Sequence, residues 1–170
     1  MDPEPSSLLF LSDILQPFTL DLLFPLVLLL ILLLGSALVS GSEVAFFSIT
    51  PRDIDELKER KHPRLDTLIE LLDHPKTLLA TILIANNFIN VGIVILSKFL
   101  SDALFDFSAN EQLGLIFQIG VITFLILLFG EVLPKVYATK NSTGFGLIMC
   151  GPMFILRRLF RPVSILLVRS

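Results

Sequence analysis

Three long apolar runs restrict this chain to a membrane protein. Residues 22–47, 76–100 and 113–134 each reach the roughly 20 residues that a helix needs to cross about 30 Å of hydrocarbon. Helices satisfy all their backbone polar groups within the segment, which lipid requires. Apolar residues make up 54% of the 170, and the mean hydropathy of +0.82 excludes a soluble globular domain. The sequence therefore predicts an all-α membrane protein with three transmembrane helices per protomer.

The distribution of basic residues predicts the orientation of these helices. No Lys or Arg precedes Arg52, six lie within residues 52–76, six more lie from Lys135 onward, and Lys98 stands alone between the two groups. Loops rich in Lys and Arg stay in the cytoplasm. We therefore expect the N-terminus outside and the C-terminus in the cytoplasm, an arrangement that three spans satisfy and two or four do not.

The regions outside the spans differ in charge and hydropathy. Residues 1–21 carry only acidic charges and predict a short outer segment. Residues 51–75 begin with a helix-starting Thr-Pro pair and contain a His-Pro break, so they predict a cytoplasmic helical hairpin. Near the C-terminus, the apolar pieces 147–156 and 159–168 are too short to cross and are separated by arginines. They predict interfacial juxtamembrane helices over residues 143–170.

Two carboxylates lie inside the predicted spans, where charge is costly, and two serine hydroxyls lie within three residues of the first of them. Ser40, Ser42 and Glu43 fall in the cytoplasmic half of the first span, and Glu131 falls within a turn of the cytoplasmic end of the third. An intramembrane acid usually faces a protein interior and serves a function. Glu43 is close enough to the inner interface that its carboxylate can also extend to water.

The second span supplies amides at a matching depth. Asn86 and Asn90 are four residues apart and share a helix face. Pro134 cannot donate a backbone hydrogen bond to Gly130, so we expect the carbonyl oxygen of Gly130 to be free beside Glu131. These groups can meet near the middle of the bundle. The alternative for the asparagines is simple hydrogen bonding between helices.

Carboxylate, amide, hydroxyl and carbonyl oxygens are ligands for hard cations. The spans contain no histidine, and the single cysteine of the chain, Cys150, lies outside them. Such a set suits Mg²⁺, Ca²⁺, Mn²⁺ or Na⁺ and argues against zinc and copper. The residues alone do not select one of these four ions.

Three motifs in order resemble the transmembrane domain of the CorC/CNNM family of magnesium transporters, also known as hemolysin-like proteins. They are "SGSEVAFFSITPRDIDEL", "IANNFINV" and "GEVLPKVYATKN". The first of them also resembles the gliding-motility-associated branch called GldE. The resemblance covers nearly the whole chain from about residue 22, which makes residues 22–142 one ion-binding core.

The resemblance implies an ion site and an activity. Carried over by motif, Mg²⁺ would be held by Ser40, Asn86, Asn90, Glu131 and the carbonyl of Gly130. Sodium-driven Mg²⁺ export is the implied activity, in a bacterial inner membrane. Ser42 and Glu43 are candidates for an outer layer around the Mg²⁺ ligands or for a Na⁺ site.

The resemblance also implies partners. We expect a homodimer surrounded by membrane lipids, with no nucleic acid partner. Full-length relatives continue into a cytoplasmic CBS-pair module that binds nucleotide, and this module is expected downstream and absent from this chain. The alternative function is a membrane scaffold or cation sensor of a motility or secretion apparatus, without transport. We expect no enzyme, because no serine in the spans is accompanied by a histidine and no nucleophile-elbow motif is present.

Overall fold

The computed structural model describes residues 19–106 and 111–169, and these residues are helical apart from short connections. The elements are η1 (Leu20–Leu22), α2 (Leu23–Ser48), α3 (Pro51–Glu59), α4 (Leu65–Leu72), α5 (Pro75–Leu104), α6 (Glu111–Leu125), η2 (Ile126–Val132), α7 (Leu133–Lys140) and α8 (Ser142–Arg169). The all-α prediction is confirmed for these residues. The predicted outer segment, 1–21, lies almost entirely outside the described residues.

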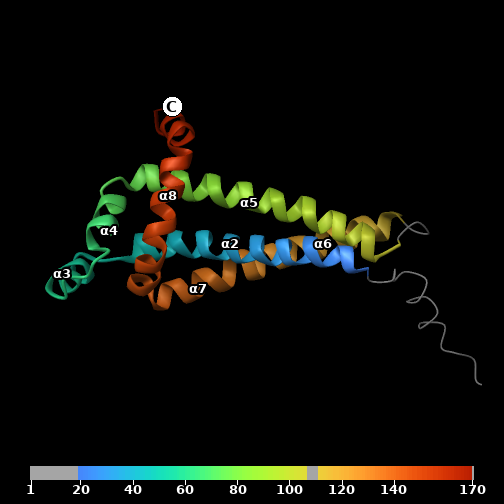
Figure 1. The fold of residues 1–170 in the computed structure, drawn as a ribbon, viewed down its shortest axis with the longest axis horizontal. Helices are drawn as coiled ribbons and strands as arrows, with labels where there is room; N and C mark the ends of the chain where they lie inside the picture. The colour runs from blue at the N-terminus through green and yellow to red at the C-terminus, as the bar shows by residue number, and fades with distance from the viewer. Residues whose placement is uncertain (1–18, 107–110, 170) are drawn as a thin grey trace, which may run out of the picture.

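Three long helical rods run along the long axis of the molecule (Figure 1). α2 and the continuous rod α6–η2–α7 run in one direction, and α5 returns in the other. This order brings α3, α4 and α8 to one end of the bundle (Figure 1). Among the described residues, length and composition allow four helices to cross a membrane: Leu20–Ser48, Pro75–Leu104, Gly114–Lys140 and Ser142–Arg161.

The fourth of these helices, α8, differs from its prediction. The two separate short helices predicted near the C-terminus are wrong, because one continuous helix runs through Arg157, Arg158 and Arg161. Arginine is a good helix former, and its long side chain can carry the charge away from the helix axis. α8 lies across the three rods and contacts α2, α4 and α5 (Figure 1).

Two helix boundaries also lie beyond their predicted positions. α5 continues past residue 100 to Leu104, where Lys98 and Asp102 form an i,i+4 ion pair at 3.0 Å on its surface. The third rod continues past residue 134 to Lys140, because the π-helical segment directly before α7 accommodates Pro134, which lacks a backbone proton. Both rods are therefore longer than the apolar runs that predicted them.

Two short helices, α3 and α4, connect the first and second rods. α3 begins at Pro51, as the sequence predicted, and Thr50 caps it with a reciprocal pair of hydrogen bonds to Asp53. The hydroxyl of Thr50 donates to the Asp53 carboxylate at 2.6 Å, and these bonds lower the pKa of Asp53. The cap fixes the start of α3 directly after the end of α2 at Ser48.

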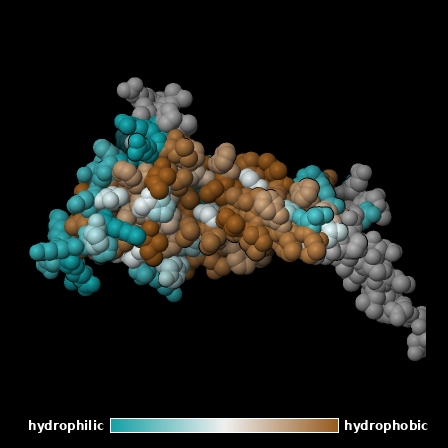
Figure 2. All heavy atoms as spheres, viewed as in Figure 1, coloured by the Kyte–Doolittle hydropathy of each residue, from teal (hydrophilic) through white to brown (hydrophobic). Residues whose placement is uncertain are grey.

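The core lies where α8 crosses the rods. Its fully buried side chains include Phe46 of α2, Leu71 of α4, Leu78 of α5 and Met153 of α8. Farther along the rods, large apolar side chains point outward. Figure 2 shows this hydrophobic surface along the rods, with most hydrophilic residues at the end that carries α3 and α4 and a smaller group at the opposite end. An apolar surface of this kind fits contact with lipid and not with water.

Candidate functional site

Ser36 of α2 is the centre of a buried polar contact between two rods. Its side chain is completely buried, and its hydroxyl lies 2.8 Å from the amide oxygen of Asn90 and 3.2 Å from that of Asn86, both on α5. The prediction that Asn86 and Asn90 share a face is confirmed, since both reach the same hydroxyl. Three oxygen atoms from two helices therefore converge on one point.

In this arrangement, one of the two amide oxygens lacks a hydrogen bond from Ser36. A serine hydroxyl has one proton, so it can donate to one of the two amide oxygens at a time. Asn90 is the better acceptor by distance. The amide oxygen of Asn86 then faces the hydroxyl oxygen of Ser36 with no proton between them. Such a pair of oxygens favours a bound cation at this position.

The third rod reaches the same place through Gly130. Gly130 is buried, and a β-carbon added to it would lie 3.0 Å from the Ser36 hydroxyl oxygen. A larger residue at this position would require Ser36 to shift by a few tenths of an ångström. Ser36, the two asparagines and Gly130 thus join α2, α5 and η2, and we call these four residues the polar cluster.

The backbone around Gly130 is π-helical. Leu133 donates to the carbonyl of Leu128, five residues back, and the irregular segment ends at the turn that contains Pro134. Pro134 lacks the backbone proton that an α-helix would direct to the carbonyl oxygen of Gly130. The backbone before the proline therefore adopts π-helical hydrogen bonding. Short π-helical segments of this kind are frequent at functional sites. A free carbonyl at Gly130 stays a prediction.

The polar cluster lies near the middle of α2 and α5, and Gly130 lies 10 residues before the end of the third rod at Lys140. Ser36 is 16 residues from Leu20 and 12 from Ser48, and Asn90 is about 15 residues from each end of α5. At a rise of about 1.5 Å per residue, the cluster is roughly 20 Å from either end of the bundle. An ion bound there would be remote from water on both sides.

Ser40 lies one helical turn from the cluster. It is four residues from Ser36, on the same face of α2, and its buried hydroxyl has no hydrogen-bond partner among the described residues. A buried unpaired hydroxyl costs about 1–3 kcal/mol, so it indicates a missing water or ion. The ligand role predicted for Ser40 remains a prediction, whereas the contact with the asparagines belongs to Ser36.

Ser36 was missed as a site residue in the sequence. Its spacing from Ser40 matches the spacing of Asn86 from Asn90, and this repeated i,i+4 pattern is the signal that would have found it. The choice between the two serines depends on how α2 and α5 are aligned. Gly92 packs on Leu32, which places Ser36 level with the asparagines.

Glu131 directly follows Gly130 and is partly buried. Within the described residues, no hydrogen bond or ion pair reaches its carboxylate, and none joins it to the polar cluster. Glu131 is therefore the sequence neighbour of a cluster residue, and its carboxylate has no partner that would prevent it from binding an ion. No three His, Cys, Asp or Glu side chains come together anywhere in residues 19–106 and 111–161 to hold a metal, so the polar cluster is not a site of that kind.

The side chains of Ser42 and Glu43 make their contacts outside the polar cluster. The Ser42 hydroxyl donates to the carbonyl of Leu38 in its own helix, at 2.7 Å. The Glu43 carboxylate pairs with Lys135 of α7 at 3.0 Å, and about 40% of each side chain is exposed. Glu43 thus joins α2 to α7 near the polar end of the bundle. A role for either residue in a Na⁺ site stays a prediction.

A close contact between helices lies between the cluster and that polar end. A β-carbon on Gly41 would lie 2.7 Å from the ring of Phe145 and 3.3 Å from the carbonyl oxygen of Pro134. The ring of Phe145, on α8, therefore covers α2 where α7 approaches it. Phe145 thus packs on α2 between the polar cluster and the end that carries α3 and α4.

The fold and this cluster together define a class: an all-α membrane domain with a polar, oxygen-lined site between its helices. A family model described as the cyclin M transmembrane N-terminal domain matches residues 27–170. The chain belongs to this family. The resemblance to the CorC/CNNM family is confirmed, and the GldE branch stays a prediction.

Curated relatives of the chain include both bacterial and animal proteins. It is 29% identical over 134 residues to the UPF0053 protein sll1254 of Synechocystis, covering 78% of this chain and 37% of the relative. It is 29% identical over 108 residues to the UPF0053 inner membrane protein YfjD of Escherichia coli, covering 61% and 23%. It is 29% identical over 117 residues to the metal transporter cnnm-2 of Caenorhabditis elegans, covering 65% and 14%. The chain spans little more than a third, or less, of the length of these relatives.

Proposed function

We propose that this chain is the membrane core of a metal-ion transporter, which carries Mg²⁺ through a site between its three rods. The family supports metal transport, since one relative bears the name of a metal transporter. The observation that carries the proposal is the convergence of Asn86 and Asn90 on Ser36 beside Gly130. Sodium-driven export is the direction that we propose.

The ligand set favours a hard cation that is held loosely. Serine, asparagine and a backbone carbonyl offer neutral oxygens, and Glu131 adds one negative charge. A single carboxylate does not neutralise a divalent ion. The bound ion would therefore retain a net positive charge, which favours its release, as transport requires. Ser40, one turn away, is the next oxygen along α2.

The proposed membrane topology follows from the same arrangement. The three rods would cross the bilayer, and α3, α4 and α8 would lie at the cytoplasmic face. All Lys and Arg other than Lys98 belong to the segments 52–76 and 135–169. The first of these segments and α8 lie at one end of the bundle (Figure 1), so the positive-inside tendency gives them a common side.

Alternating access would require opening on each side of the cluster in turn. On the proposed cytoplasmic side, the contact of Phe145 with Gly41 is the barrier. Sliding of α2 against α7 would uncover Ser40 and then Ser36. The Glu43–Lys135 pair bridges the same two helices and would have to adjust in this step.

Flux into vesicles is the direct test. The chain is reconstituted in liposomes that contain a Mg²⁺-sensitive dye, and Mg²⁺ entry is followed with and without an opposing Na⁺ gradient. We expect flux from the wild type, dependence on Na⁺, and loss of flux in Glu131→Gln. A folded wild type that binds Mg²⁺ and carries none would instead support the scaffold or sensor alternative.

A further inference from the structure

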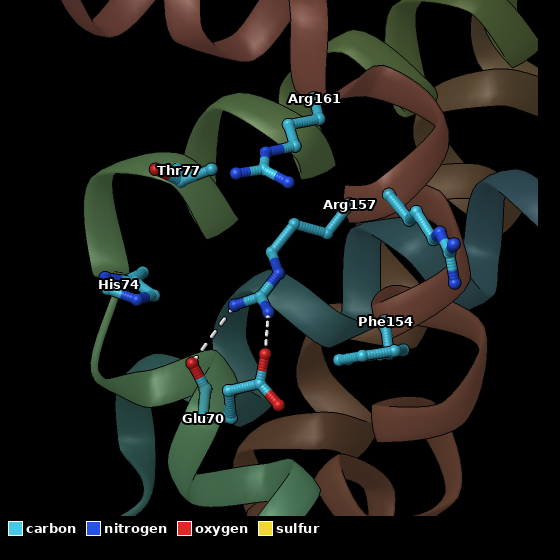
Figure 3. A pocket seen from close by; sticks show the side chains of 7 residues that line it. Glu70, His74, Thr77, Phe154, Arg157 and Arg161 are labelled. Atoms are coloured by element: carbon cyan, nitrogen blue, oxygen red, sulfur yellow. Dashed lines mark hydrogen bonds and ion pairs between the residues drawn. The ribbon is translucent and has the colours of Figure 1, made fainter.

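A basic cavity lies between α8 and the segment that joins α4 to α5. Its volume is about 540 Å³, and its lining includes Arg157, Arg158 and Arg161 of α8 together with His74 and Glu70. Figure 3 shows Arg157 and Arg161 reaching from α8 toward the side that carries Glu70, His74 and Thr77. The cavity is far from the polar cluster, which lies near the middle of α2 and α5.

The cavity has an excess of positive charge. Arg157 is already paired, since it donates to the carboxylate of Glu70 and, at 3.1 Å, to the backbone carbonyl of the same residue. Arg157 also lies 5.4 Å above the ring of Phe154. Within the described residues, no hydrogen bond or ion pair reaches Arg158 or Arg161. Three arginines and one glutamate therefore leave a charge of about +2, with two guanidinium groups available.

Guanidinium groups in this arrangement fit a phosphate. Arginine presents a planar fork of donors that matches two phosphate oxygens at once, and charge assistance makes such bonds about twice as strong as neutral ones. Arg157 is held in place by Glu70 and Phe154, so one wall of the cavity is already ordered. A volume of this size accommodates a small headgroup.

The surroundings of the cavity favour a lipid as the source of that phosphate. Ile155 and Leu159, which flank the arginines on α8, are 68% and 66% exposed. Leu79 and Leu83, on the first turns of α5 beyond His74, are also exposed. The basic cavity thus lies between two helices, α8 and α5, that both carry exposed apolar side chains on their other faces, and a basic pocket between apolar helices at a membrane surface is typical of anionic-lipid sites.

We infer that this cavity binds the phosphate group of an anionic phospholipid, through Arg158 and Arg161. The bound lipid would connect α8 to the start of α5. This site is independent of the proposed metal transport, because none of its residues belongs to the polar cluster.

Native mass spectrometry of the detergent-purified protein tests this inference. Phosphatidylglycerol, phosphatidylcholine and inorganic phosphate are added in separate titrations to the wild type and to the double variant Arg158→Gln/Arg161→Gln. We expect the wild type to retain phosphatidylglycerol in preference to phosphatidylcholine, and the variant to bind phosphatidylglycerol at least about tenfold more weakly.

Two further variants distinguish lipid binding in the cavity from the effect of net charge and from misfolding. Arg52→Gln/Lys61→Gln removes the same charge from exposed positions outside the cavity and should retain wild-type preference. Arg158→Lys/Arg161→Lys keeps the charge without the fork and should recover part of the binding. Equal loss in the cavity variant and its charge-matched control overturns the inference. Saturable binding of inorganic phosphate without any lipid preference also overturns it, and would assign the cavity to free phosphate.

Discussion

Removal of the Ser36 hydroxyl is the perturbation whose cost the structure defines best. Ser36→Ala deletes one oxygen that lies 2.8 Å from Asn90 and 3.2 Å from Asn86, without changing the packing of the β-carbon. One proton makes one hydrogen bond at a time, so the loss is that of a single bond plus the exposure of an unpaired amide oxygen. Interhelical hydrogen bonds in membranes average about 0.6 kcal/mol, with a maximum near 1.7.

Burial decides where within this range the cost should fall. Ser36 is completely buried, whereas both asparagines are partly exposed and can find other partners. We therefore expect Ser36→Ala to lower the free energy of unfolding by about 1 kcal/mol. The control is Ser48→Ala, at an exposed serine of the same helix, which should change stability by less than about 0.5 kcal/mol.

A double-mutant cycle makes the test specific to the contact. Ser36→Ala, Asn90→Ala and the double variant are unfolded in mixed detergent micelles, with helicity followed by circular dichroism. If Ser36 donates to Asn90, the coupling energy between the two residues should be about 0.5–1.5 kcal/mol. Strictly additive effects would show that Ser36 and Asn90 do not interact, and would refute the polar cluster as described.

Three other changes test separate contacts. Lys135→Met should cost less than about 1 kcal/mol, because its partner Glu43 is partly exposed, and it should leave Mg²⁺ affinity unchanged; a tenfold loss in a binding isotherm would instead connect the pair to the ion site. Gly41→Ala should destabilise the protein by about 1–3 kcal/mol through its clash with the ring of Phe145, and Phe145→Leu in the same chain should restore most of that loss in thermal unfolding. Thr50→Ala should cost about 1 kcal/mol by uncapping α3, measured by chemical denaturation, and retention of full stability would contradict the role of the cap.

Much of the fold is predictable because its signals are local. Apolar length defines the rods, and the Thr-Pro pair defines the start of α3 through a capping preference that depends on adjacent residues alone. The shared face of Asn86 and Asn90 follows from helical periodicity in the same way. These predictions need no knowledge of how the helices pack.

The remaining features depend on how separate helices align. Ser36 and Ser40 share one face of α2, and the packing of α2 against α5 decides which of them is level with Asn90. The partner of Glu43 is likewise fixed by the approach of α7 to α2, at Lys135. Neither alignment is encoded in a short stretch of sequence.

One local prediction failed, and one local feature was not predicted. The arginines of α8 looked like a boundary between two short helices, yet a charged residue interrupts an apolar pattern without interrupting a helix. At Pro134, the missing proton was foreseen, but the response was not. The chain adopts a π-helical segment before the proline, and Gly130 within this segment approaches Ser36.

The most direct test of the proposed metal site is Mg²⁺ binding to Asn90→Ala, compared with Asn87→Ala. Both changes remove an asparagine from the same helix, but Asn90 reaches the buried hydroxyl of Ser36 whereas Asn87 is exposed. Isothermal titration calorimetry on the purified chain should show saturable Mg²⁺ binding in the wild type and in Asn87→Ala, and at least about tenfold weaker binding in Asn90→Ala. Equal affinity in the two variants would contradict the account, because the ion would then bind somewhere other than the polar cluster.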